Sequence, residues 1–139
     1  MSNIVGRALV LEEGLSLWGG MDPATGELID PHHPQCGVAL SGRVVVMPSG
    51  RGSSSSASVL AEAVRAGTAP AAFVLEEPDL ILAIGSAVAE ELYGVRVPVV
   101  VLRPAAREPI VDGAELVIGL DGSVHRVQGR AGPGPMTSD

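Results

Sequence analysis

The sequence predicts an α/β domain whose mixed sheet curls toward a barrel and is flanked by helices. Three apolar strand-like segments alternate with helical ones, which is typical of right-handed β-α-β crossovers. Two further short segments enclose Asp121 and Gly122, a dipeptide that favours a hairpin and hence antiparallel strands. With 139 residues, 46% of them hydrophobic, the chain is long enough to build one domain around its own core.

The first predicted strand covers residues 4–11, where aliphatic residues dominate. Residues 12–42 follow as a long stretch rich in glycine, proline and aspartate, with a candidate short strand at residues 27–29. Such a long loop inside a compact domain is uncommon and usually has a function. Residues 43–47 form the second strand, and their run of three valines is typical of a strand buried on both faces.

The first helix is expected over residues 55–66, where one face is apolar and Gly67 follows the carboxyl end. The next helical region is less sharply defined. Residues 79–84 fit either a helix or a strand, whereas residues 86–93 are more clearly helical, with Ser86 as the candidate N-cap.

The remaining strands complete the predicted sheet. Apolar strands are expected at residues 71–75 and 97–102, and the hairpin pairs residues 114–119 with residues 123–127. The glycine- and proline-rich tail, residues 128–139, is expected to be disordered. The predicted domain therefore spans residues 1–127.

Composition excludes several classes of function. The net charge is −7, and all nine basic residues are arginines scattered along the chain, so nothing attracts a nucleic-acid backbone. Only 2% of the residues are aromatic, which leaves no platform for stacking bases. No apolar run reaches the ~18–20 residues that cross a bilayer. A single cysteine, Cys36, and an amino end unlike a signal peptide indicate the cytoplasm.

The segment between the second strand and the first helix carries the chemistry. Gly50 and Gly52 let the backbone approach a ligand, Arg51 offers a cation for a carboxylate or phosphate, and four serines open the helix, where the dipole is positive. A hydroxyl held there is a candidate proton acceptor, because amide groups would stabilise its alkoxide. The alternative interpretation is a polar turn that only caps the helix.

Two other groups of residues are candidate sites. His32, His33 and Cys36 have a spacing found among metal ligands, but flanking prolines favour an exposed turn, and one cysteine cannot hold an iron–sulfur cluster alone. We therefore expect no metal site in this chain. Trp18 fits a substrate pocket, a subunit interface or simple packing.

Three ordered motifs resemble a known family. They are residues 15–26, which include Trp18-Gly19-Gly20, residues 46–56 around the serines, and the tripeptide at residues 77–79. In this arrangement they are similar to the small, swivelling subunit of the aconitase X family. The resemblance covers nearly the whole chain except the tail, and it implies a swivelling β/β/α domain.

The resemblance further implies a subunit of a hydro-lyase that is inactive alone. A large partner subunit would hold an iron or iron–sulfur centre acting as a Lewis acid, while this chain would bind no cofactor and close over the substrate as a lid. By the resemblance, Ser53 is the catalytic base, Ser54 is the next candidate for that role, and Arg51, Gly52, Ser54 and Ser55 bind the substrate.

Two substrates are compatible with the family. The form of the serine segment together with Trp18-Gly19-Gly20 resembles the bacterial group, which dehydrates cis-3-hydroxy-L-proline to a pyrroline carboxylate. The alternative substrate is phosphomevalonate, since Arg51 suits a phosphate as well as a carboxylate. A function of another class, a non-catalytic anion-binding or regulatory module, also fits the same loop. The sequence leaves the type of metal centre and the stoichiometry of assembly open.

Overall fold

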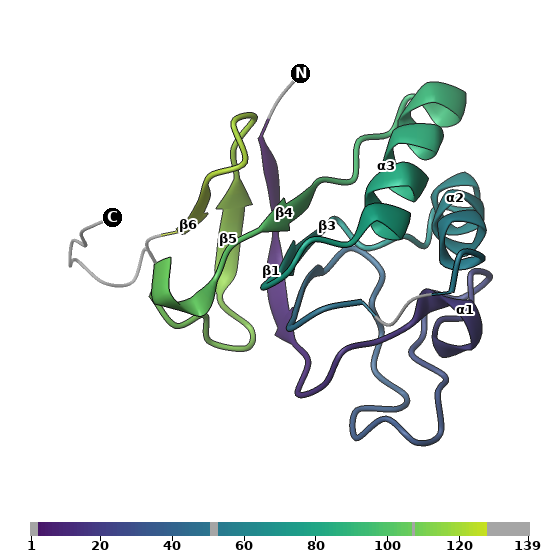
Figure 1. Ribbon diagram of the computed structural model, residues 1–139, viewed down its shortest axis with the longest axis horizontal. Coiled ribbons are helices and arrows are strands. Elements are labelled where there is room, and N and C mark those ends of the chain that lie inside the picture. The colour runs from purple at the N-terminus through teal and green to yellow at the C-terminus, as the bar shows by residue number, and fades with distance from the viewer. Residues whose placement is uncertain (1–2, 51–52, 107, 128–139) are drawn as a thin grey trace.

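Residues 3–50, 53–106 and 108–127 are described by the computed structural model, and they form a mixed six-stranded sheet with the α-helices on one face (Figure 1). The strands lie in the order β4-β3-β2-β1-β5-β6. In chain order the elements are β1 (Ile4–Val10), α1 (Leu17–Gly20), β2 (Val44–Met47), α2 (Ser56–Ala66), β3 (Ala72–Leu75), α3 (Leu80–Tyr93), β4 (Val99–Val101), η1 (Pro104–Ala106), β5 (Glu115–Ile118) and β6 (Val124–Arg126).

The sheet has a parallel part and an antiparallel part, which meet in β1. Strands β1 to β4 are parallel neighbours, whereas β5 and β6 form the predicted antiparallel hairpin. The first half of β1 pairs with β5, where Ile4 faces Ile118, and its second half pairs with β2, where Ala8 faces Val44. Both the mixed sheet and the crossovers through α2 and α3 agree with the sequence prediction.

The central strands are apolar throughout because both of their faces are covered. On the helical side, Val45, Met47, Phe73 and Leu75 join a cluster with α2 and α3. On the other side, alternate residues of the same strands pack with the terminal hairpin in a second cluster that includes Leu116. The run of valines at residues 44–46 therefore serves two cores, as expected for a buried parallel strand.

The second helix begins earlier than its clearest sequence signal. Helix α3 starts at Leu80, and the side chain of Asp79 accepts a hydrogen bond from the Leu82 N–H at 3.0 Å. The prediction of Ser86 as N-cap is wrong: it lies inside α3, and its hydroxyl donates to the Val97 carbonyl at 2.5 Å. This bond ties α3 to the segment that leads into β4.

The long segment at residues 12–42 is ordered, although it contains little regular structure. It contributes buried side chains to the helical-side cluster: Leu15, Leu17, Met21, Leu28 and Leu40. In place of the short strand expected at residues 27–29, isolated bridges join Met21 to Leu28 and Glu27 to Ala39. The segment is thus part of the core rather than a loose loop. The tail predicted at residues 128–139 lies outside the described residues.

Candidate active site

The serine loop, residues 49–56, lies where the carboxyl end of β2 leads into the amino end of α2. Two other segments meet it there. The distorted turn α1 approaches from the long segment, and the start of α3 approaches from β3 (Figure 1). Parallel strands place such loops at one edge of the sheet, which is the usual position of ligand sites in α/β proteins.

The four serines have different environments. Ser53 is half-buried; its Oγ accepts the Ser55 N–H at 3.2 Å, and its carbonyl accepts the Ser56 N–H at 2.9 Å. Ser54 is exposed, and Ser55 is the half-buried N-cap residue of α2, whose carbonyl accepts the Val59 N–H. Ser53 therefore keeps a hydroxyl near the surface while an amide already points at its oxygen.

Ser56 belongs to the scaffold rather than to the open face. It is buried, and its Oγ accepts the Trp18 N–H at 3.2 Å and lies 3.4 Å from Ser16 Oγ. This contact ties α1 to the first turn of α2 and leaves the Trp18 side chain exposed. Of the predicted site residues, Ser53, Ser54 and Ser55 are thus brought together on one turn, whereas Arg51 and Gly52 lie outside the described residues.

Gly50 is held by two neighbours. It forms a parallel bridge with Leu15, and a Cβ atom added to it would lie 1.9 Å from Asp79 Oδ2. Asp79 therefore has two roles, because Oδ1 caps α3 while Oδ2 occupies the space beside the loop. The sequence patterns described above predict neither role of Asp79. Asp79 follows Pro78 and precedes an apolar run, which is an N-cap signal, so its role as the cap of α3 could have been predicted from the sequence.

The two histidines of the candidate metal-ligand spacing lie in different environments. His32 and Cys36 are exposed, but His33 is buried, contrary to the expected exposed turn. His33 Nδ1 accepts the Gln35 N–H at 3.0 Å, and Nε2 donates to the Glu13 carbonyl at 3.2 Å, so both ring nitrogens are engaged. In the described parts of the chain no three histidine, cysteine or acidic side chains converge as metal ligands. These residues do not fit an iron centre.

Comparison with known proteins identifies the family. The model of the aconitase X swivel domain matches residues 2–127. The chain belongs to this family. The small, swivelling fold expected from the three motifs is thereby confirmed, and an aconitase X crystal structure from Thermococcus kodakaraensis (holo-form) superposes with a TM-score of 0.79. That match has 25% identity and covers 91% of each chain.

Relatives of this swivel domain carry two different names. A cis-3-hydroxy-L-proline dehydratase from Pseudomonas aeruginosa is 52% identical over 70% of this chain, which spans only 17% of that relative. A phosphomevalonate dehydratase small subunit from Methanothrix thermoacetophila is 34% identical, over 86% of this chain and 88% of its own length. The chain thus matches most of the length of a small subunit in one relative and about a sixth of a longer protein in the other. Among the described residues, no helix is long and apolar enough to cross a membrane.

Proposed function

We propose that this swivel domain is the small subunit of a hydro-lyase, that its substrate is cis-3-hydroxy-L-proline, and that Ser53 is the general base. Family membership and the names of the relatives support the reaction class. The 52% identity to the Pseudomonas dehydratase favours the hydroxyproline substrate. The observation that carries the proposal is the geometry of Ser53: a half-buried hydroxyl at the start of α2 whose oxygen accepts an amide N–H.

The reaction removes a proton from C2 of the ring and the hydroxyl from C3, and the electron pair of the C–H bond becomes the new carbon–carbon double bond. Ser53 Oγ would take the C2 proton. A serine hydroxyl is a weak base, so this role needs the alkoxide to be stabilised; the Ser55 N–H and the positive end of the α2 dipole act in that direction. Arg51 would hold the substrate carboxylate, with Gly52, Ser54 and Ser55 around it.

The departing hydroxyl needs a Lewis acid, which we place in the partner chain as an iron or iron–sulfur centre. The described residues of this chain do not converge on a metal. In the Pseudomonas relative, more than four fifths of the protein lies beyond the part that this chain matches. We therefore propose a heteromer with a large aconitase X subunit, inactive when either chain is missing and located in the cytoplasm.

An assay of the reconstituted pair tests this proposal. The chain is co-expressed with the large aconitase X subunit of the same genome, and the complex is given cis-3-hydroxy-L-proline or phosphomevalonate. We expect pyrroline carboxylate from the first substrate and no product from either chain alone. If the complex converts phosphomevalonate but not cis-3-hydroxy-L-proline, the second candidate substrate is the correct one. The relatives named as phosphomevalonate dehydratase small subunits favour this alternative. If no large chain co-purifies and this chain alone binds small anions, it is a regulatory module.

A further inference from the structure

Helix α3 has an apolar face that the rest of the described chain leaves uncovered. Leu80, Ile84 and Val88 are spaced four residues apart, so they follow one another along the helix, and we call them the α3 stripe. Leu80 is 72% exposed and Ile84 is 45% exposed. Since the core-facing side of α3 is also apolar, this helix is hydrophobic on two sides, which is typical of a helix covered by further protein.

The α3 stripe begins at the serine loop. Leu80 follows Asp79, whose carboxylate lies against Gly50 of that loop. Trp18 lies at the other end of the loop, where its N–H is bonded to Ser56, and it is 59% exposed. Exposed, large apolar side chains therefore lie near both ends of the polar loop, an arrangement that resembles a binding surface more than the scattered apolar residues of an ordinary surface.

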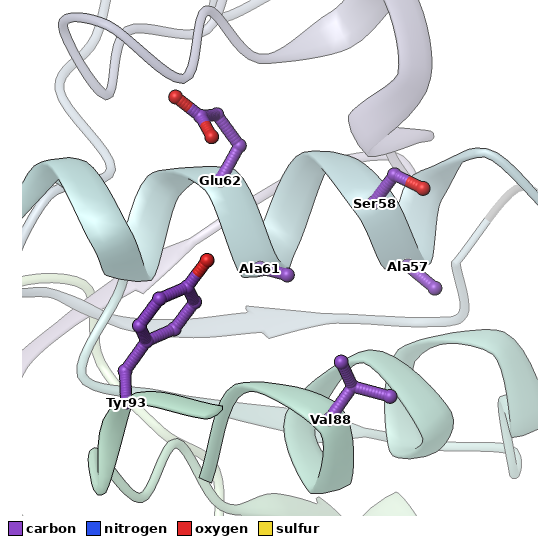
Figure 2. A pocket seen from close by; sticks show the side chains of 6 residues that line it. All are labelled: Ala57, Ser58, Ala61, Glu62, Val88 and Tyr93. Atoms are coloured by element: carbon purple, nitrogen blue, oxygen red, sulfur yellow. The ribbon is translucent and has the colours of Figure 1, made fainter. Parts of the chain in front are cut away.

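A shallow groove of about 330 Å³ continues this surface between α2 and α3. Figure 2 shows Val88 and Tyr93 of α3 facing the small side chains Ala57 and Ala61 of α2. The groove starts at Ala57, directly after the last serine, where Gly85 permits close packing: a Cβ on Gly85 would lie 3.0 Å from the Ala57 Cα.

The far end of the groove is charged. Glu62 lines it and is paired with Arg65, whose side-chain hydrogen bond holds the pKa of that carboxyl below its usual value. Glu90 and Glu91 are exposed at the same end of α3. Because Arg65 balances the charge of Glu62, the acidic border of the surface consists of Glu90 and Glu91, in a chain whose net charge is −7.

We propose that Trp18, the α3 stripe and the groove beside it form the surface on which this chain docks to the large aconitase X subunit. The inference rests on the proposed function, because a serine loop that acts on a substrate held by another chain must face that chain. Surfaces continuous with the loop are then buried together with it. The partner surface should be apolar at its centre and basic at its rim, complementary to the acidic border.

The test measures binding of the purified chain to the large subunit by sedimentation and biolayer interferometry. In the test variant, Leu80→Asp and Ile84→Asp are combined. In the matched control, Val111→Asp and Leu120→Asp are combined, since these residues are 61% and 52% exposed and lie outside the proposed surface. We expect the test variant to bind about tenfold more weakly or worse, and the control to bind like the unmodified chain.

Circular dichroism and thermal melting establish that both variants are folded, as expected for exposed positions. A second variant, Trp18→Ala, probes the other side of the loop, and it too should weaken binding. Equal binding by the test variant, the control and the unmodified chain would overturn the inference. A second result would also overturn it. If the unmodified chain forms a dimer, and the test variant is monomeric but binds the large subunit with unchanged affinity, the α3 stripe joins two copies of this chain.

These outcomes are separable from failure of the proposed function. Ser53→Ala should bind the large subunit normally. If the Ser53→Ala complex is fully active, Ser53 is not the base, yet a weakened test variant still supports the docking surface. If the unmodified chain does not bind the large subunit at all, the heteromer and the docking surface are both wrong.

Discussion

Two polar segments of this chain resemble each other in sequence but not in structure. The histidine loop, residues 30–37, and the serine loop, residues 49–56, which follows Pro48, both combine glycine with chemically versatile side chains. In the histidine loop, the polar groups of His33 and Gln35 are bonded to the chain itself, at Glu13, Glu12 and Val10. In the serine loop, Ser53 and Ser54 remain near the surface at a helix start.

The difference shows which property distinguishes a scaffold loop from a candidate site. Gln35 accepts the Glu12 N–H at 2.8 Å and donates to the Val10 carbonyl at 3.0 Å, so its side chain fastens the loop to the end of β1. Such buried, satisfied groups contribute stability and are closed to a ligand. A polar segment indicates a functional site only where its side chains remain available to bind a ligand.

The largest expected effect is a loss of catalytic activity, and it should occur for a substitution in the serine loop but not in the histidine loop. Replacing Ser53 with alanine should lower the turnover of the reconstituted complex by roughly 10³-fold, because a positioned general base contributes about 10²–10⁴-fold. Folding should suffer by only about 1 kcal/mol, for the lost bond to the Ser55 N–H. Steady-state kinetics and urea denaturation give the two values. The control is Ser41→Ala, a serine that precedes the amino end of β2 and therefore lies outside the serine loop, and its turnover should not change. Full activity of Ser53→Ala would show that Ser53 is not the base.

The second effect is a loss of stability without a loss of activity, and it is expected for a substitution in the histidine loop. His33→Ala removes two hydrogen bonds and leaves space in a buried position, so the free energy of unfolding should fall by about 2–3 kcal/mol. Turnover per folded complex should not change. Urea denaturation of the chain measures the first quantity, and kinetics below the melting temperature measure the second. Replacing its exposed neighbour, His32→Ala, should leave both nearly unchanged; a catalytic loss in His33→Ala contradicts a purely structural role.

The third effect lies inside the serine loop and tests how it is held. Gly50→Ala places a Cβ against Asp79 and should cost about 1–3 kcal/mol, as overpacking does, while also reducing turnover. Asp79→Ser keeps a side-chain oxygen able to cap α3 but removes the second oxygen that fills this space. Adding Asp79→Ser to Gly50→Ala should therefore restore much of both losses. A strictly additive double variant, in melting and in kinetics, would show that the two residues are not coupled.

The smallest expected effect is a change in the pKa of Asp121, in the turn between β5 and β6. This turn serves as a reference for both loops. Hydrogen bonds from Ser123 hold the pKa of Asp121 below its usual value of 3.8. Because the folded-state pKa is the lower one, this stabilisation is present above the unfolded pKa and is lost as the pH falls through the folded value. Ser123→Ala should raise the Asp121 pKa toward 3.8, as measured by NMR titration, with no change in turnover. The backbone bond from the Ser123 N–H remains in this variant, so an unchanged pKa would mean that the bond from the Ser123 hydroxyl does not form.

Much of the fold follows from local sequence signals, but the extent of α3 does not. The apolar runs of β2 and β3 and the one-sided pattern of α2 predict their elements, because each is apolar where the core lies. The start of α3 was ambiguous because exposed Leu80 and Ile84 add apolar residues to the outer face and hide the helical period. The feature that hid the helix is the one from which the docking surface is inferred.

The position of the serine loop was predictable from the sequence. Which of its serines are exposed and which one supports the scaffold was not. A buried strand followed by glycines and a helix start locates the loop from residues that are neighbours in sequence. The role of Ser56 depends on Trp18, which is 38 residues away in the chain and is brought there by the packing of the long segment. Likewise, the contact between Gly50 and Asp79 joins two different crossovers of the sheet.

The shared strand β1 has a consequence for how the chain folds. It precedes both partner strands in the chain, so Ile4 can pair with Ile118, and Ala8 with Val44, only after those later residues have been synthesised. Contacts so distant in sequence slow folding, because the closure of long loops precedes any gain from them. On a ribosome, residues 44–101 can assemble their strands and helices while β1 still lacks its antiparallel neighbour, so closing the sheet is expected to be the last step.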